Sequence, residues 1–310
     1  ESRYKAEREA LNSLRTSMTT FKSAITKLNS STSSMLTNSA TFSQEGYATA
    51  TVGTTAKAGT YDFFVERLAA KQQVAVQGLV DGSLSGTLTL NAQSFDLSQY
   101  ATLGDAATAI NDAGLGVQAT LVRSNGAVSL VVSSEQTGAA NAFSLSMTGN
   151  AAATTTQLST AQDAMVRLGG SYGTGGIELT SASNTFTDVI DGVSLTVSKT
   201  HAATDTPLTV TVDQDKAGTQ AKAQTFIDAF NALMTSFDSL TASGSGSDSA
   251  KRGALAGDSS VRSIESRLNG LLRADFGGKS LIEFGISADR NGKLTIDAKR
   301  FEAAVANDPA

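Results

Sequence analysis

The chain has 310 residues, no cysteine, no tryptophan and a formal net charge of −5. The lack of cysteine excludes disulfides, thiolate catalysis and cysteine-based zinc or iron–sulfur sites, and the acidic balance argues against nucleic acid as a partner. No apolar run is long enough to span a membrane, and we expect no cleavable signal peptide, because no charged segment followed by an apolar one opens the chain.

The first segment, residues 1–41, is predicted to be one long amphipathic helix. Its apolar side chains recur at steps of three, four and seven residues, which places them on one helix face. Because this stripe is narrow, another helix is needed to cover it. The apolar positions are Tyr4, Leu11, Leu14, Met18, Phe21, Ile25, Leu28 and Met35.

Residues 45–212 are predicted to be rich in strands and to form two nested domains. One head domain is expected over 45–70 plus 159–212, and a second, inserted into the first, over 71–158. The inserted region looks self-contained, since it has its own hairpins, helix and apolar positions.

Local signals place the elements of the inserted region. Hairpins are expected around 91–93 and 123–126, the latter because Asn-Gly between alternating apolar runs is typical of a tight turn. Thr102 is expected to cap a short helix that ends near Asn111. Residues 151–160 are of low complexity and are predicted to be a surface connection.

A second long helix is predicted from Asp213 or Asp215 to about Leu240. Its apolar residues have the same spacing as those of the first helix. We therefore expect residues 1–44 and 213–310 to form one helical stem. The packing seam of this stem is predicted to comprise Leu11, Leu14, Met18, Phe21, Ile25, Leu28, Phe226, Phe230, Leu233 and Phe237.

Shorter elements are expected to close the stem. Residues 241–247 are rich in Ser and Gly and are predicted to be a flexible link. Asp258 is the expected N-cap of a third helix, a hairpin is expected to turn at 289–292, and a final helix follows Asp297. Their apolar positions are Val261, Ile264, Leu268, Leu271, Ile282, Phe284, Ile286, Leu294, Ile296, Phe301 and Val305.

These predictions together give an α+β multidomain fold, in which a helical stem formed by both chain ends carries two nested β-rich head domains. Residues 1–28 contain six basic and three acidic residues, whereas residues 45–212 contain six basic and thirteen acidic ones. The expected stem is therefore mildly basic, and the expected head is acidic.

Candidate chemistry is sparse. His201 is the only histidine, and its polar surroundings between two strands predict a solvent-exposed loop residue. Asp213–Gly218 partly matches a calcium loop, but Gln224 stands where the bidentate Glu belongs, so a helix N-terminus is the better interpretation. Asp289–Gly292 has its glycine too early for such a loop, which favours a β-turn.

Two further features carry little chemical signal. Residues 169–176 are rich in glycine, but no helix with a phosphate-binding N-terminus follows, so they are predicted to be a loop. Asp188 and Asp191 could form a glycosidase-like carboxylate pair, yet solvated acids are common at turns. We expect no enzyme activity, no cofactor and no metal site.

Several segments match, in the same order along the chain, the sequence pattern of one protein family. The most specific are 253–262 (Gly-Ala-Leu-Ala-Gly-Asp-Ser-Ser-Val-Arg), 284–287 (Phe-Gly-Ile-Ser) and 291–297 (Asn-Gly-Lys-Leu-Thr-Ile-Asp). The others are 59–69, 106–111, 116–120, 130–138, 161–164, 191–195 and 226–233. In their joint order these segments resemble the flagellar filament cap family, also called flagellar hook-associated protein 2.

The resemblance implies a structural protein at the extracellular tip of the bacterial flagellar filament, exported through the flagellar apparatus without a cleavable signal. It implies a ring-shaped homo-oligomer of about five or six subunits that promotes the folding and insertion of flagellin, with an export chaperone as a further partner. The chain opens within a helical pattern at Glu1 and closes at Ala310, and we expect both natural ends and the family's terminal coiled-coil segments to lie outside it.

Two other functions stay open from the sequence. An acidic, outermost head could act as an adhesin that binds host glycans or mucin. A glycoside hydrolase would turn over a glycoside substrate and would lose this activity when a carboxylate such as Asp188 or Asp191 is changed. We expect no such turnover. The subunit number and the residues of the oligomer interface cannot be derived from the sequence, because polar β surfaces at interfaces resemble any solvated face.

Overall fold

The computed structural model describes residues 2–28, 37–124, 126–244, 252–275, 279–290 and 292–307. Contacts divide the chain into two units, one comprising Glu1–Ser39 with Gln214–Ala310 and the other comprising Ala40–Asp213. We call them the helical unit and the β unit. Both chain ends contribute to the helical unit, and the β unit consists mainly of antiparallel sheets, which confirms the predicted fold class.

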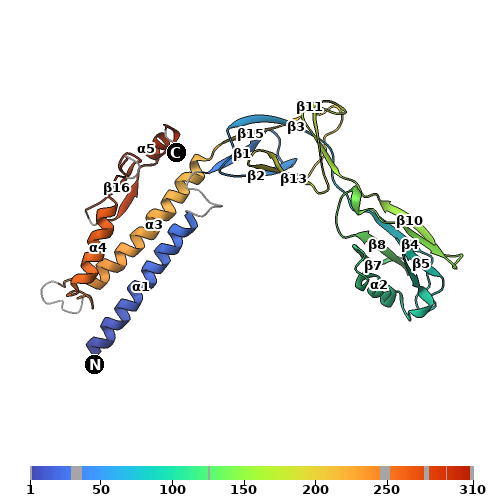
Figure 1. Cartoon of the computed structure of the whole chain (residues 1–310), viewed down its shortest axis with the longest axis horizontal. Helices are drawn as coiled ribbons and strands as arrows, with labels where there is room; N and C mark the ends of the chain where they lie inside the picture. The colour runs from blue at the N-terminus through green and yellow to red at the C-terminus, as the bar shows by residue number, and fades with distance from the viewer. Residues whose placement is uncertain are drawn as a thin grey trace. The chain divides into compact units, whose positions relative to one another are not determined.

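The helical unit is built on two long helices that lie side by side (Figure 1). They are antiparallel, because Ser17 lies beside Ser236 and Phe21 beside Phe226. A third helix and a small hairpin with a final helix complete the unit. The elements are α1 (Ser2–Leu28), α3 (Lys216–Thr241), α4 (Ser259–Leu271), β16 (Ile286–Ala288), β17 (Leu294–Ile296) and α5 (Ala298–Asn307).

The ends of these helices follow the sequence signals. The Asp215 carboxylate accepts a hydrogen bond from the Gly218 N–H at 2.8 Å and caps α3. The Asp258 carboxylate caps α4 by accepting hydrogen bonds from the N–H groups of Ser260 and Val261. A side-chain oxygen at this position satisfies backbone donors that have no partner within the helix. The predicted Asp258 N-cap is therefore confirmed, and of the two predicted starts of the second long helix, Asp213 and Asp215, the structure selects Asp215.

The first helix is shorter than predicted. α1 ends at Leu28, and residues Asn38–Phe42 form a strand, β1, instead of the last turns of a helix. The strand forms because residues 38–42 lie beside residues 208–214 in one sheet, a partner too distant in the sequence for a local helical pattern to reveal. Met35, which was expected on the helix face, lies outside the described residues, as do residues 245–247 of the predicted link 241–247.

Two sheets of the β unit share one hydrophobic core. The five-stranded sheet has the order β1-β15-β3-β11-β12, and the three-stranded sheet has the order β13-β14-β2. Phe63, Val65, Leu195 and Leu208 are among the buried core residues, and they come from both sheets. The strands are β2 (Ala48–Val52), β3 (Gly59–Arg67), β11 (Ala164–Ser171), β12 (Thr174–Ser181), β13 (Thr185–Ile190), β14 (Val193–Val197) and β15 (Leu208–Gln214).

The remaining sheets of the β unit form a second core with helix α2. A four-stranded sheet has the order β10-β4-β8-β7 and a three-stranded sheet the order β6-β5-β9. Leu88, Leu103, Ile110 and Leu130 are fully buried in this core. The elements are β4 (Gln73–Gln77), β5 (Thr87–Leu90), β6 (Gln93–Asp96), η1 (Leu97–Gln99), α2 (Leu103–Asp112), β7 (Val117–Ser124), β8 (Ala127–Ser134), η2 (Ala139–Asn141), β9 (Leu145–Thr148) and β10 (Thr154–Ser159).

The local signals of this region are confirmed by the elements that form there. Thr102 and Asp105 make a reciprocal capping box at the start of α2, and both expected hairpins are present, as β5 with β6 and β7 with β8. Whether residues 71–158 form an independent domain stays a prediction.

Two predicted connections are strands. Residues 154–159 form β10, which pairs with β4, because a run of Thr suits an extended backbone even when its side chains are exposed. Residues 169–176 are not a loop but the end of the β11–β12 hairpin, with Gly170 opposite Gly175. A Cβ on Gly170 would collide with the backbone of Gly175, so the glycines permit close pairing.

Candidate interaction surface

The inner face of α1 packs against α3. Leu14 is buried in one hydrophobic cluster with Phe230, Leu233 and Phe237. The Phe21 ring lies with its centroid 5.9 Å from the ring centroids of both Phe226 and Phe230, a separation at which aromatic pairs attract. The structure therefore brings together six of the predicted seam residues, two from α1 and four from α3. They are Leu14, Phe21, Phe226, Phe230, Leu233 and Phe237.

The outer face of α1 carries a second apolar row that α3 does not cover. Tyr4, Leu11, Met18 and Ile25 follow one another at steps of seven, and their exposed fractions are 82%, 46%, 37% and 39%. Single exposed apolar residues are ordinary, but this spacing aligns four of them along one helix face. The predicted seam of α1 thus contains two rows. In the row facing α3, Leu14 is buried and Phe21 and Leu28 are half-buried, whereas the second row is exposed.

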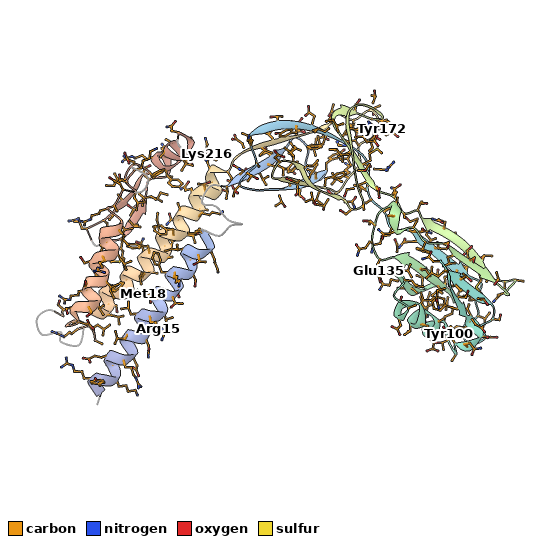
Figure 2. The ribbon with its side chains drawn as sticks, in the orientation of Figure 1. Arg15, Met18, Tyr100, Glu135, Tyr172 and Lys216 are labelled. Carbon is orange, nitrogen blue, oxygen red and sulfur yellow. The ribbon has the colours of Figure 1, made fainter. Side chains whose placement is uncertain are left out.

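An apolar groove of about 850 Å³ lies beside this row, between α1 and α4, and reaches Leu233 of α3. Figure 2 shows Arg15 and Met18 on adjacent turns of α1. The apolar residues that line the groove are Leu11, Leu14, Met18, Phe21, Ile25, Leu233, Val261, Ile264 and Leu268, and the polar ones are Arg15, Thr19, Lys22, Thr26, Asp258 and Ser260.

The α1 side of the groove is basic. Arg15 and Lys22 both line it, seven residues apart, and neither forms a salt bridge with any residue that the structure describes. The acidic residue in the lining is Asp258, whose carboxylate already accepts two backbone N–H groups as the α4 cap. The groove therefore combines an apolar floor with an uncompensated basic rim.

His201 is not the exposed loop residue that the sequence predicts. It is 4% exposed, and its ring stacks between Tyr47 and Phe64 at centroid distances of 4.4 and 4.8 Å. Its Nδ1 accepts a hydrogen bond from the Val65 N–H at 2.9 Å, whereas Nε2 has no partner among the described residues. Burial lowers the pKa of His201, an effect that nearby Lys199 reinforces and Asp205 opposes.

This arrangement does not suit catalysis. A general base of the triad type needs a carboxylate that accepts a hydrogen bond from the Nδ1–H group, but the Nδ1 of His201 itself accepts a hydrogen bond from a backbone N–H. The prediction failed because Tyr47 and Phe64, which enclose the ring, lie far from His201 in the sequence and no local pattern reveals them.

The other acidic candidates stabilise turns. The Asp188 carboxylate accepts the Gly192 N–H at 2.7 Å, which fixes the β13–β14 turn instead of presenting a free carboxylate with Asp191. The Asp289 backbone N–H donates to the Lys293 carbonyl oxygen, and the Asp289 carboxylate accepts the Lys293 backbone N–H. The Gly292 N–H donates to the Asp289 carbonyl oxygen at 3.1 Å, which confirms the β-turn interpretation. Within the described part of the chain, no group of three or more His, Asp or Glu side chains could hold a metal ion.

One charged cluster was not predicted from the sequence. Arg167 on β11 donates hydrogen bonds to Glu66 on β3 and to Glu178 on β12, the latter at 2.9 Å. Glu66 also accepts the Gly173 N–H at 2.9 Å. Burial acts to raise the pKa of Glu66, but the hydrogen bonds from Gly173 and Arg167 outweigh it and lower that pKa. The cluster connects the end of the hairpin to the sheet. Tyr172, which is labelled in Figure 2, also lies edge-on to Phe64.

Comparisons with known proteins agree on one family. The sequence profile of the flagellar hook-associated protein 2 N-terminus matches residues 1–72, and that of the flagellar hook-associated protein 2 C-terminus matches residues 161–310. Both ends of the chain are thereby assigned to the family that the sequence segments resemble. No described helix is long and apolar enough to cross a membrane.

Named relatives support the same assignment. The lateral flagellar hook-associated protein 2 of Vibrio parahaemolyticus is 38% identical over 299 residues, which cover 88% of this chain and 66% of the relative. The B-type flagellar hook-associated protein 2 of Pseudomonas aeruginosa is 31% identical over 332 residues, covering 96% of this chain and 70% of the relative. The chain thus spans about two thirds of the length of these relatives.

A solved structure is also similar. The crystal structure of the D1-D2-D3 domains of the flagellar cap protein FliD from Escherichia coli superposes with a TM-score of 0.70 and 26% sequence identity. The match covers 97% of this chain and 88% of that one.

Proposed function

The chain belongs to the flagellar hook-associated protein 2 family, and from this premise we propose that it acts as a structural cap at the distal tip of a bacterial flagellar filament. The observation that carries the proposal is the similarity to the Escherichia coli cap structure, which extends over nearly the whole chain. This is a family of structural proteins and not of enzymes, and the buried His201 and the turn-forming Asp188 fit that character.

The finer part of the proposal concerns assembly. We expect the protein to be exported to the filament tip, to form a ring of about five or six copies and to promote the folding and insertion of flagellin. An export chaperone is a further expected partner. Support comes from the largely polar β surfaces, which suit many weak contacts with neighbouring subunits. The alternative that the β unit binds host glycans or mucin is not favoured, because the named relatives are flagellar hook-associated or cap proteins.

Deletion of the gene in the source organism tests this proposal. We expect cells without the protein to lose long filaments and to release unpolymerised flagellin into the medium, as measured by electron microscopy and by immunoblotting of culture supernatants. A plasmid copy should restore filaments. Filaments of normal length in the deletion strain would contradict a capping role.

A further inference from the structure

We propose that residues 198–207, which join β14 to β15 and which we call the strap, detach from β3 in mild acid when His201 is protonated. The proposal concerns a local opening within the β unit and does not depend on the capping function. Three observations carry it, namely how the strap is anchored, which side chain completes the strand edge beside it, and which atom of that side chain lacks a partner.

The strap has a single buried anchor. The structure describes every residue of 198–207, and His201, which is 4% exposed, is the one buried residue among them. Its ring stacks between Tyr47 and Phe64, and hydrogen bonds to residues 44–47 hold the two ends of the strap. The attachment of the middle of the strap therefore depends on one side chain.

His201 takes the place of a strand residue beside β3. The ladder between β3 and β15 ends at the pair Phe63–Leu208, and Val65 is the next residue of β3 that faces the same neighbour. There the His201 backbone N–H donates to the Val65 carbonyl oxygen, and the imidazole Nδ1 accepts the Val65 N–H. The imidazole thus supplies the acceptor that the carbonyl of a paired strand would supply.

The chain contains a counterpart that does not titrate. At the edge strand β7, the Asn111 side chain accepts the Ala119 N–H at 2.6 Å and donates to the Ala119 carbonyl oxygen at 3.1 Å. An imidazole differs from this amide because it changes its charge between about pH 5 and 8, and a protonated Nδ1 is a donor that cannot accept. Protonation of His201 would leave the buried Val65 N–H without a partner, which favours release of the strap.

The attached strap also leaves one polar atom unsatisfied. Because Nδ1 is an acceptor, the neutral ring of His201 carries its proton on Nε2. Nε2 is buried and has no partner among the described residues, and a buried donor without an acceptor destabilises the state in which it occurs. Release would bring both ring nitrogens into water. The attached state is thus held by aromatic stacking and by a hydrogen bond that requires a neutral ring.

Two charges in the strap itself act on the ring. Burial lowers the pKa of His201, and the Lys199 cation lowers it further, whereas Asp205 acts to raise it. The Lys199 Nζ lies 4.5 Å from the centroid of the Tyr47 ring, which stacks on His201. Since the released ring has its ordinary pKa of 6.5, we expect opening to begin as the pH falls below that value.

Charges on the sheet beneath the ring are paired or do not oppose this transition. Side chains alternate along β3, so Asp62 and Glu66 share the face of Phe64, and Arg167 lies opposite Phe64 in the ladder with β11. Glu66 and Arg167 form an ion pair, and the Asp62 carboxylate accepts a hydrogen bond from a β15 hydroxyl at 2.7 Å. As the only histidine, His201 is the group of this cluster that changes charge in mild acid.

Two NMR measurements on the chain test the proposal. Ring-nitrogen chemical shifts follow the protonation of His201 without ambiguity, because the chain has no other histidine. Hydrogen exchange of the Val65 amide follows the opening. We expect the protection factor of Val65 to fall about tenfold for each pH unit below 6.5, down to the pKa of the attached ring. Protonation of the ring with no loss of Val65 protection would overturn the proposal.

Low concentrations of urea separate release of the strap from unfolding of the whole β unit. Leu195 lies in β14, the central strand of its sheet, and reports complete unfolding. Urea accelerates hydrogen exchange in proportion to the surface that an opening exposes. In mild acid, urea should therefore accelerate the exchange of Leu195 strongly and that of Val65 little. An equal response of the two amides would show that acid unfolds the unit as a whole and would exclude a separate strap.

Three variants connect the opening to the imidazole. His201→Asn keeps a side-chain acceptor and does not titrate, so Val65 protection should no longer fall below pH 6.5. Lys199→Gln removes a repelling cation and should move ring protonation and Val65 opening together to higher pH. Lys57→Gln, the control, removes an exposed lysine elsewhere in the β unit and should move neither. A wild-type slope in His201→Asn, or separate midpoints for protonation and opening in Lys199→Gln, would overturn the proposal; if His201→Asn does not fold, Lys199→Gln decides.

Discussion

His201 and Val65 form a reciprocal backbone-and-side-chain pair in the core of the β unit. The Val65 backbone N–H donates to the imidazole Nδ1 of His201, and the backbone N–H of His201 donates to the Val65 carbonyl oxygen. Both distances are 2.9 Å. Because the imidazole nitrogen must be unprotonated to accept this bond, the pair requires the neutral ring. Protonation of Nδ1 would break the bond and place a charge between two aromatic rings.

The β unit should consequently lose stability in mild acid. Burial lowers the pKa of His201 in the folded protein below its ordinary value of 6.5, so the unfolded chain binds more protons just below that pH. The free energy of unfolding should therefore fall as the pH drops below 6.5 towards the folded-state pKa. Urea denaturation at a series of pH values measures this. His201→Phe should be less stable at neutral pH but should show a flatter pH dependence; an unchanged slope would refute the assignment.

Arg167→Met should destabilise the β11–β12 hairpin. The substitution leaves the Glu66 carboxylate, whose side chain is 14% exposed, without its cation. Removing one partner of a fully buried ion pair costs about 3–5 kcal/mol of unfolding free energy, and the loss here should be smaller because both side chains are partly exposed to solvent. Hydrogen exchange of the hairpin amides and urea denaturation measure the loss. Arg123→Met, on the exposed end of β7, is the matched control and should change stability little; equal effects of the two variants would contradict a special role for the cluster.

Glu265→Gln on α4 should stabilise the helical unit at neutral pH. Burial raises the pKa of Glu265, and the nearby Asp238 charge raises it further. The folded protein therefore holds this proton more tightly than the unfolded chain, and stability attributable to Glu265 falls as the pH rises above its ordinary value of 4.5. The gain should be present at neutral pH and should vanish in acid. Glu9→Gln on the exposed face of α1 should show no such gain, and a destabilised Glu265→Gln would be inconsistent with this cause.

The two rows of the stem seam should differ in their effect on stability. Phe230 is 2% exposed and contacts Phe21, so Phe230→Ala should cost about 3–5 kcal/mol of unfolding free energy through lost burial and a new cavity. Met18 is 37% exposed, so Met18→Ala should cost less than about 1 kcal/mol. Thermal and urea unfolding compare the two. Similar losses would mean that Met18 is as important to the folded core as Phe230.

The parts of the fold that the sequence predicts well depend on neighbouring residues. Thr102, Asp215 and Asp258 cap helices because the acceptor and the donors lie within a few residues of each other. The spacing of Leu14 and Phe230 likewise reveals a helix face without reference to the partner. Such local signals predicted the helices and both hairpins of the inserted region.

Elements that depend on distant partners were predicted less well. His201 looks polar in sequence because Tyr47 and Phe64 approach it only in the folded sheet. Strand β10 was missed because its side chains are exposed and β4 holds it through the backbone. The seam itself could not be divided into buried and exposed rows, since heptad spacing does not say which row faces α3. The exposed row that lines the groove became evident only from the fold.

The central claim is that this protein caps the distal end of a flagellar filament. Immunogold electron microscopy of intact filaments, with antibodies raised against the 310-residue chain, tests it most directly. The account predicts label at the free tips of filaments and none along their length. Label spread along the filament, or confined to the cell surface, would contradict it.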